Sequence, residues 1–283
     1  MLNPARVSKR SDALPDAHAQ RIGRAAIAAL YDELALAPKP GLVSFVDSGS
    51  HHDMDATTFL RSLFALRHYF PRIAMLGARA APFAELETLG IVAEGRMLAA
   101  TGGVNTHRGA VFTLGLLCAA VGEGRITAAQ CRERLLRCWG DALRARRHRE
   151  CASNGRIAAH AHGLRHVGDE AALGFPAVFE VGLPALARAR AAGMNDRAAR
   201  LQTLFETIAV LDDTNLAHRG GLAGLRFAQG QARAFLSAGG AARPDALAHA
   251  QAIHRAFVAR RLSPGGAADV LAAAGLIERV CLA

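Results

Sequence analysis

The segment PFAELETLGIVAEGRMLAATGGVNTHRGAVFTLGLLCAAV, residues 82–121, decides the fold class. Residues 82–100 are rich in Ala, Leu and Glu, which are strong helix formers. The polar, glycine-rich stretch 101–109 interrupts this pattern, and the nearly wholly apolar stretch 110–121 follows it. The segment therefore predicts a helix, a polar loop and a buried helix in succession.

The same helical pattern extends outward from this segment in both directions. Few runs of Val, Ile, Thr or Tyr alternate with polar residues, so β-strands are not expected to be the main secondary structure. Pro38 and Pro40 end the first helix, Asp55 suits an N-cap, and Ser263 before Pro264 suits the start of the last helix. The expected helices cover residues 18–36, 56–70, 82–100, 110–121, 127–149, 151–166, 176–192, 197–211, 222–238, 244–260 and 266–280.

These helices predict an all-α fold: one multi-helix bundle over residues 18–283, in which glycine-rich loops form the active site. Residues 1–17 are expected to be a disordered lead. With 283 residues, 51% of them hydrophobic, the chain is long enough to bury a substantial core. No long linker or low-complexity tract divides it.

The chain carries a net charge of +10, and almost all of its basic residues are arginine, since Lys9 and Lys39 are the only lysines. Such an excess attracts anions, whether nucleic acid, an acidic membrane or a small polyanion. Against nucleic acid, the arginines are scattered, and the basic run 144–149 has only Trp139 nearby for stacking. A small polyanionic ligand fits best.

Five cysteines without a CxxC pair make a zinc site unexpected and fit a reducing cytoplasm. The polar, basic N-terminus lacks the apolar stretch of a signal peptide. The longest apolar run, residues 109–122, is too short to cross a bilayer. We therefore expect a cytoplasmic protein with no membrane partner.

The loop 101–109 is the first candidate site. Gly102 and Gly103 would let the backbone approach a ligand closely, and the following helix would point its positive end at an anion. Arg108 adds a fork for phosphate. Thr101, Asn105, Thr106 and His107 add neutral polar groups. The alternative is a plain turn between two helices.

Glu94 precedes this loop and would be a magnesium ligand, since hard cations take oxygen donors; alternatively it is a solvated surface residue. The second candidate site runs from Asp212 to Gly221, where two adjacent aspartates need a cation or an arginine such as Arg219 beside them. It could equally be an ordinary capped helix end. Asn105-Thr-His-Arg-Gly109 recurs loosely as Asn215-Leu-Ala-His-Arg-Gly220, as if two matching loops reached one site.

The loop from Lys39 to Asp55 holds the clustered side chains His51, His52 and Asp53. An acid/base or orienting role suits them better than a metal site. A third glycine-rich segment, residues 260–269, offers Ser263 and backbone N–H groups at another helix start, or simply a cap.

Six segments carry a family resemblance through their order and spacing: Pro38-Lys-Pro-Gly-Leu-Val43, Gly49-Ser-His-His-Asp-Met-Asp55, Thr101-Gly-Gly-Val-Asn-Thr-His-Arg-Gly-Ala110, Gly174-Phe-Pro176, Asp213-Thr-Asn215 with Arg219-Gly-Gly221, and Leu262-Ser-Pro-Gly-Gly-Ala-Ala-Asp269. Together they resemble the triphosphoribosyl-dephospho-coenzyme A synthase family over residues 20–280. Ser-Phe-Val-Asp at residues 44–47 resembles the malonate decarboxylase branch more closely than the citrate lyase branch.

The resemblance implies an all-α transferase that moves the 5-triphosphoribosyl group of ATP to the 2′-hydroxyl of 3′-dephospho-coenzyme A and releases adenine. The product would be the prosthetic-group precursor of an acyl carrier protein, and Mg²⁺ would accompany ATP. Competing functions are another nucleotide N-glycosyl transferase or hydrolase and a basic helical nucleic-acid-binding protein. Oligomeric state stays open.

The resemblance, combined with the chemistry of the residues, also implies roles. The expected phosphate ligands are Lys39, Arg108 and Arg219, and the magnesium ligands are Glu94, Asp212 and Asp213. Asp53 or His51 is the expected general base, and Asp213 is a further catalytic candidate. Ribose or phosphate would be oriented by Asn105, His107 and Asn215. Further ATP contacts are expected from Thr101, Gly102, Gly103, Gly220 and Ser263.

Two positions depart from the family pattern. Ser44 stands where an aspartate is usual, and Asp47 is the candidate to replace it. Gly168 stands where an arginine is usual, and Arg165, one helical turn away, could compensate.

Overall fold

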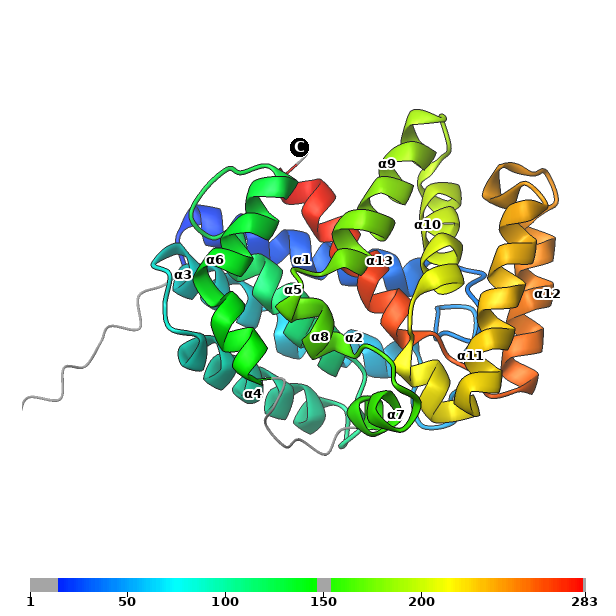
Figure 1. Cartoon of the computed structure of the whole chain (residues 1–283), viewed down its shortest axis with the longest axis horizontal. Coiled ribbons are helices and arrows are strands. Elements are labelled where there is room, and N and C mark those ends of the chain that lie inside the picture. The colour runs from blue at the N-terminus through cyan, green and yellow to red at the C-terminus, as the bar shows by residue number, and fades with distance from the viewer. Residues whose placement is uncertain (1–14, 147–153, 282–283) are drawn as a thin grey trace, which may run out of the picture.

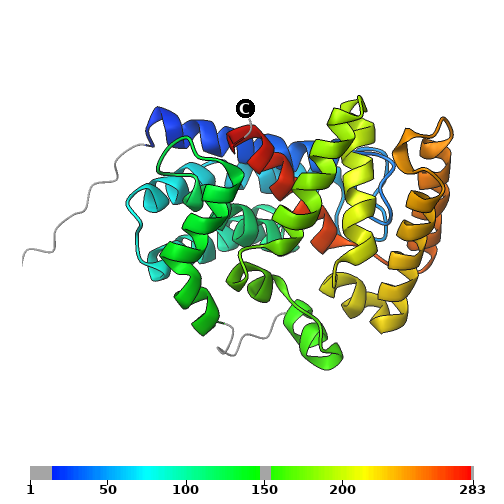
Figure 2. The same cartoon turned by 45° about the horizontal axis from the view of Figure 1, so that its top comes forward.

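The last helix, α13 (Gly265–Cys281), runs through the middle of the molecule in both views of the fold (Figures 1 and 2). The computed structural model describes residues 15–146 and 154–281. Apolar residues occupy nearly every face of α13, which is typical of a helix with neighbours all around it. Two hydrophobic clusters meet on it, because Leu276 and Ile277 belong to one and Ala267 and Leu271 to the other.

The first and larger cluster is built on the N-terminal half of the chain. In it α5 lies between α13, α3 and α6, so its side chains are buried on most faces. The helices on this side are α1 (Ala17–Ala35), α2 (Ala56–Leu66), α3 (Tyr69–Ala78), α4 (Phe83–Ala100), α5 (Arg108–Ala120), α6 (Ala128–Arg146), α8 (Val167–Ala172), the π-helical turn η1 (Ala177–Gly182) and α9 (Leu183–Ala191).

The second cluster lies at the other end of the molecule, where α11 and α12 stand beside α10 (Figure 1). Stacked rings of Phe205 and Phe235, with centroids 3.9 Å apart, join α10 to α11. The elements of this side are α10 (Asp196–Val210), α11 (Thr214–Ser237), the 3₁₀ turn η2 (Gly240–Ala242) and α12 (Ala246–Ala259), and α7 (Asn154–His162) packs on α11.

The all-α prediction is confirmed, and the described residues contain no strand. Three details of the predicted helices were wrong. The helix expected over 56–70 is two helices that break between Leu66 and Tyr69, and α3 continues to Ala78. The short helix α8 was not expected. The loop expected from 212 to 221 is mostly helical, because α11 begins at Thr214 and only Gly221, at φ +61°, leaves the helical path.

Helix starts follow the expected capping chemistry where the sequence is clear. Asp55 is the N-cap of α2, as predicted, and it forms a reciprocal capping box with Thr58. Residues 1–14 of the expected disordered lead lie outside the described residues, and α1 begins at Ala17 with Asp16 as its N-cap. The expected helices 127–149 and 151–166 also lie partly outside that range. None of the described helices is both long and apolar enough to cross a membrane.

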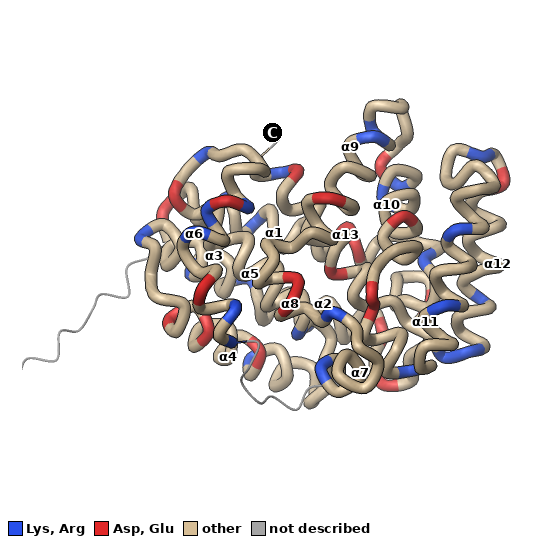
Figure 3. The backbone as a smooth tube through the Cα atoms, viewed as in Figure 1, with Lys and Arg blue, Asp and Glu red and all other residues tan. Residues whose placement is uncertain are grey.

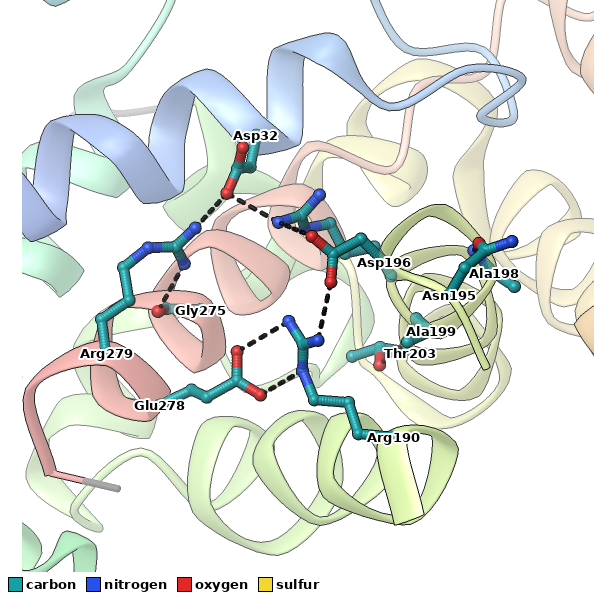
Figure 4. A network of polar contacts seen from close by, with 11 residues as sticks. Asp32, Arg190, Asn195, Asp196, Ala198, Ala199, Thr203, Gly275, Glu278 and Arg279 are labelled. Atoms are coloured by element: carbon teal, nitrogen blue, oxygen red, sulfur yellow. Dashed lines mark hydrogen bonds and ion pairs between the residues drawn. The ribbon is translucent and has the colours of Figure 1, made fainter. Parts of the chain in front are cut away.

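An ion-pair network on the outer side ties α1, α9, α10 and α13 together (Figure 4). Asp32 on α1 accepts from Arg279 and, at 2.8 Å, from Arg200. Arg190 on α9 bonds both Glu278 and Asp196. Elsewhere, basic and acidic positions are interleaved over most helices in the view of Figure 3. These pairs fix the outer helices around α13, which in turn positions the cavity described next.

Candidate active site

A cavity of about 880 Å³ lies between the two clusters and collects the N-termini of three helices. Gly109 at the start of α5, Thr214 at the start of α11 and Gly265 at the start of α13 all line it. Unpaired N–H groups and the helix dipole make such termini favourable for anions. The side chains on its wall include five arginines, which are Arg108, Arg146, Arg156, Arg165 and Arg219. The cavity is therefore suited to a polyanionic ligand.

The glycine-rich loop divides into two parts with different tasks. Gly102 and Gly103 have φ of +67° and +90°, and the Gly103 N–H bonds Leu98 O at 2.8 Å, so these glycines end α4. The buried Thr101 hydroxyl lies 2.9 Å from Met97 O and 2.6 Å from Val104 O, and its single proton can bond either carbonyl. None of the three lines the cavity, so the structure offers no direct ligand contact from them.

The second part of the loop, residues 105–109, lies on the cavity wall as predicted. Asn105 Oδ1 accepts the Arg108 N–H at 3.0 Å and so opens α5. The guanidinium of Arg108 pairs with Glu94, Nε to Oε1 being 2.6 Å. Both partners of this pair line the cavity, so a phosphate could replace the carboxylate at Arg108.

His107 is buried, and Ser62 Oγ holds its Nδ1 at 2.7 Å. Its Nε2 has no hydrogen-bond partner, and neither has the buried Oγ1 of Thr106 beside it. Burial, aided by the nearby Lys39 charge, lowers the pKa of His107 to about 3, so the ring is neutral. The structure thus leaves two buried polar atoms of this loop unsatisfied.

Lys39, expected to hold phosphate, is instead buried and does not line the cavity. Its ammonium bonds Glu33 O at 2.7 Å and also pairs with the Glu33 carboxylate. Burial lowers the pKa of Lys39, and the Glu33 carboxylate opposes that shift. A direct phosphate contact by Lys39 has no support in this geometry; the residue neutralises Glu33, which does line the cavity.

His51 and Arg219, distant in the sequence, meet at the rim. Arg219 Nη2 lies 3.0 Å from His51 Nδ1, and His51 Nε2 lies 3.0 Å from Ser263 Oγ. Asp53 Oδ1 is 3.8 Å from His51 Nδ1. Arg219 can only donate, so Nδ1 accepts, and Nε2 carries the ring proton that it shares with Ser263. Asp53, His51 and Ser263 are thus arranged in sequence, but His51 Nε2 already carries a proton and cannot accept the Ser263 hydroxyl proton.

Burial and the neighbouring Arg219 lower the pKa of His51 to about 4. A ring with both nitrogens engaged and so little basicity is a poor proton acceptor. Asp53, with a side chain 63% exposed and facing the cavity, is the less restricted of the two predicted bases.

Asp213 is buried and joins two helix starts. Its Oδ1 accepts the N–H groups of Asn215 and Leu216, at 2.9 and 3.3 Å, and so caps α11. Its Oδ2 accepts the Ala267 N–H at 3.0 Å at the start of α13, where the sequence suggested Ser263 as the cap. Burial raises the pKa of Asp213 to about 6 against these hydrogen bonds.

The expected magnesium ligands do not converge. Glu94 pairs with Arg108, Asp213 bonds backbone N–H groups, and Asp212 Oδ2 is 4.0 Å from Arg165 Nε. Within residues 15–146 and 154–281, no group of three or more His, Cys, Asp or Glu side chains could hold a metal ion. These carboxylates thus do not form a resident protein metal site; Mg²⁺ bound to nucleotide phosphates needs only one or two of them.

Arg165, the candidate to compensate for Gly168 at the second family departure, lies on the cavity wall near Glu170. Its Nη1 is 3.5 Å from Glu170 Oε1, and Glu170 Oε2 accepts the Ala177 N–H at 2.9 Å. At the first departure, Ser44 Oγ accepts the Val46 N–H at 3.1 Å. Asp47 turns to His254 Nε2, 3.3 Å away, and does not line the cavity.

Asn215 lines the cavity beside Gly265, whereas Gly220 packs against Leu262 outside it. Both Asn-to-Gly segments therefore reach the one cavity, although Asn105 precedes α5 and Asn215 lies in the first turn of α11. Sequence reasoning missed several cavity residues that belong to no glycine loop: Glu33, Glu87, Arg146, Arg156 and His166. It also gave no role to Asp269, although this residue ends the sixth segment.

Comparisons with known proteins show the family of the chain. The model of a family described as ATP:dephospho-CoA triphosphoribosyl transferase matches residues 19–281. A protein of Pectobacterium atrosepticum described as a 2-(5″-triphosphoribosyl)-3′-dephosphocoenzyme-A synthase is 40% identical, over 88% of this chain and 85% of its own. Proteins of Azotobacter vinelandii and Acinetobacter calcoaceticus, both described as probable synthases of this kind, are 40% and 36% identical over 93% and 90% of this chain and 92% and 89% of their own. No solved structure matches significantly.

Proposed function

The chain belongs to the ATP:dephospho-CoA triphosphoribosyl transferase family, and from this premise we propose its reaction. It transfers the 5-triphosphoribosyl group of ATP to the 2′-hydroxyl of 3′-dephospho-coenzyme A and releases adenine. The observation that carries the proposal is the meeting of three helix N-termini and five arginines on one cavity wall. Both substrates are polyanions, and a volume of about 880 Å³ is large enough for a nucleotide.

The triphosphate is assigned to the starts of α5 and α11, where Arg108 and Arg219 face the cavity. Planar guanidinium groups bind phosphate through two parallel hydrogen bonds. The pair between Arg108 and Glu94 is then exchanged, since Arg108 turns to phosphate. Glu94 and Asp212 would be the carboxylates that hold the Mg²⁺ of ATP, and this ion would neutralise charge on the phosphates.

The chemistry requires charge stabilisation at the ribose and removal of the acceptor proton. Breaking a C1′–N bond gives the sugar oxocarbenium character, which carboxylates stabilise. Asp53 is assigned as the base for the acceptor hydroxyl, because His51 is neutral with both ring nitrogens engaged. Asn105, His107 and Asn215 orient the ribose and phosphates.

The test is adenine release from ATP, followed together with the mass of the coenzyme product, with and without 3′-dephospho-coenzyme A. We expect adenine and the triphosphoribosyl adduct in equal amounts and only when the acceptor is present. Adenine release without acceptor would instead make the protein a nucleotide N-glycoside hydrolase.

The downstream carrier is assigned to the malonate decarboxylase branch on the strength of Ser44-Phe-Val-Asp47. The two branches can be separated by an attachment assay, in which the purified adduct is offered to the apo carrier proteins of malonate decarboxylase and citrate lyase. The carrier protein and the attachment enzyme must be those encoded beside this gene. We expect the neighbouring genes to encode malonate decarboxylase subunits, and citrate lyase genes there would reverse the assignment.

A further inference from the structure

Asp269 lies one turn into α13, and its partly buried carboxylate lines the cavity. Most carboxylates on the wall are held by an arginine or by backbone N–H groups. Asp269 has neither a hydrogen bond nor an ion pair with any residue in the described part of the chain. An acidic group in such a position is free to act on a bound molecule.

The fold makes room for this carboxylate at the start of α5. A Cβ at Gly109 would lie 2.0 Å from Asp269 Oδ2, so only glycine allows the two to approach. The chain path of the glycine loop therefore brings the N-terminus of α5 directly beside Asp269. This close approach is a structural reason for glycine at position 109.

The charges around Asp269 favour its protonated form. From α1 comes Glu33 and from the start of α11 comes Asp213, and both disfavour a further negative charge. The cations nearby are engaged elsewhere, because Lys39 pairs with Glu33 and Arg108 with Glu94. The neutral His107 adds no positive charge. Burial, reinforced by Glu33 and Asp213, raises the pKa of Asp269 well above its ordinary value.

A second observation points to a ligand near the start of α5. Thr106 Oγ1 and His107 Nε2 are buried without partners, and both residues line the cavity just before Gly109. Buried polar atoms are rarely left unsatisfied unless a bound molecule completes them. His107, at 4% exposure and fixed by Ser62, is a preorganised group of this kind.

We propose that Asp269 is the catalytic acid that protonates the departing adenine. The inference rests on the proposed function and identifies the group that donates a proton to adenine, so that the base leaves as a neutral molecule. A carboxyl group kept protonated in a buried site can donate to a leaving group, as general acids do.

The step balances as follows. The C1′–N9 bond breaks and its electron pair goes to the adenine ring, which takes the Asp269 proton on a ring nitrogen. A lone pair of the acceptor oxygen forms the new bond to C1′, and the hydroxyl proton passes through the base to solvent. Asp269 regains a proton from solvent before the next turnover.

Asp269→Asn tests the role, with ATP and 7-methyl-ATP compared as donors. The methylated purine is already cationic and leaves as a neutral base without a proton. With ATP, we expect the variant to lose about 10²–10⁴-fold in kcat. With 7-methyl-ATP, variant and wild type should react at similar rates. The same loss with both donors would overturn the assignment, because a structural defect does not depend on the leaving group.

The pH profile gives a second readout. Wild-type kcat with ATP should fall as pH rises through the pKa of Asp269, and Asp269→Asn should lack this limb. An unchanged limb in the variant would also overturn the role. Asp141→Asn, a fully exposed Asp on α6, is the matched control and should match wild type. Wild-type enzyme that releases no adenine would contradict the proposed function itself, whereas the donor comparison concerns Asp269 alone.

Discussion

The Asp213 carboxylate accepts the Ala267 N–H at 3.0 Å, and thereby links the start of α11 to the start of α13 at the cavity wall. The same side chain caps α11 through Asn215 and Leu216. A single buried acid thus fixes the relative position of two helix N-termini that face the ligand. The geometry of the cavity depends on it even before any catalytic role is considered.

The first prediction concerns this double cap. Asp213→Asn keeps the size of the side chain but replaces one acceptor oxygen by an NH₂ group, which would face a backbone N–H. We expect a loss of about 1–3 kcal/mol in the free energy of unfolding, together with weaker ATP binding. Urea unfolding and calorimetric titration with ATP measure the two effects.

Asp212→Asn is the matched control, since Asp212 is adjacent, only partly buried and 4.0 Å from its nearest cation. It should unfold like wild type. Equal stability of the two variants would contradict the role given to the Asp213 cap.

The second prediction concerns acid stability. His107 is buried with its pKa lowered to about 3, so the folded state binds its proton less readily than the unfolded state. The unfolded chain therefore gains protons first as pH falls from about 6.5 to 3, and stability is lost over that window. The contribution of His107 amounts to at most about 5 kcal/mol.

His107→Gln removes this titration and retains hydrogen bonding to Ser62. Unfolding free energies measured by urea at several pH values should fall less steeply below pH 6.5 in the variant than in wild type. Parallel curves would show that His107 is not held neutral by the fold.

The third prediction uses glycines. Gly109→Ala would place a methyl group 2.0 Å from Asp269 Oδ2 and displace that carboxylate. We expect kcat for adenine release to fall by about tenfold or more, because a displaced acid no longer meets the leaving base. Gly95→Ala on α4, where nothing lies within 4 Å of an added Cβ, is the control.

Gly95→Ala should keep wild-type activity and gain up to about 1 kcal/mol of stability, as expected for glycine replaced by alanine inside a helix. Steady-state kinetics and thermal unfolding on both variants check the pair. Full activity in Gly109→Ala would mean that the start of α5 tolerates a side chain beside Asp269.

The fourth prediction addresses the outer ion network in Figure 4. Asp32→Asn removes the shared carboxylate of Arg200 and Arg279, so the tie between α1, α10 and α13 weakens. Breaking this network of partly buried pairs should lower the free energy of unfolding by about 1–2 kcal/mol. The difference from wild type should be smaller at high salt. Adenine release should not change, because Asp32 does not line the cavity. Urea unfolding at about 0.05 M and about 1 M salt makes the comparison, because the Debye screening length is longer than about 10 Å at the first concentration and shorter at the second.

Local chemistry determined the helices and much of the site list from the sequence alone. Alanine- and leucine-rich periodic segments identified nearly every long helix, since helix formation depends on neighbours three and four residues apart. The loop 105–109, the Asp212 segment and the Ser263 loop were predicted for one site, and each contributes residues to the wall of one cavity. The split of α2 from α3 was missed, although Pro71 in the first turn of α3 is typical of a helix start.

Tertiary structure alone decided how individual side chains are used. The sequence could not reveal that Lys39 forms an ion pair with Glu33 or that Arg219 donates a hydrogen bond to His51. Nor could it reveal that Gly102 and Gly103 end α4. It also could not place Asp269 against Gly109, 160 positions earlier in the chain. Burial, charge neighbours and free hydrogen-bonding atoms are properties of packing between distant segments. The chemical types at the site were therefore readable in the sequence, whereas their protonation, partners and access to a ligand were set only by the fold.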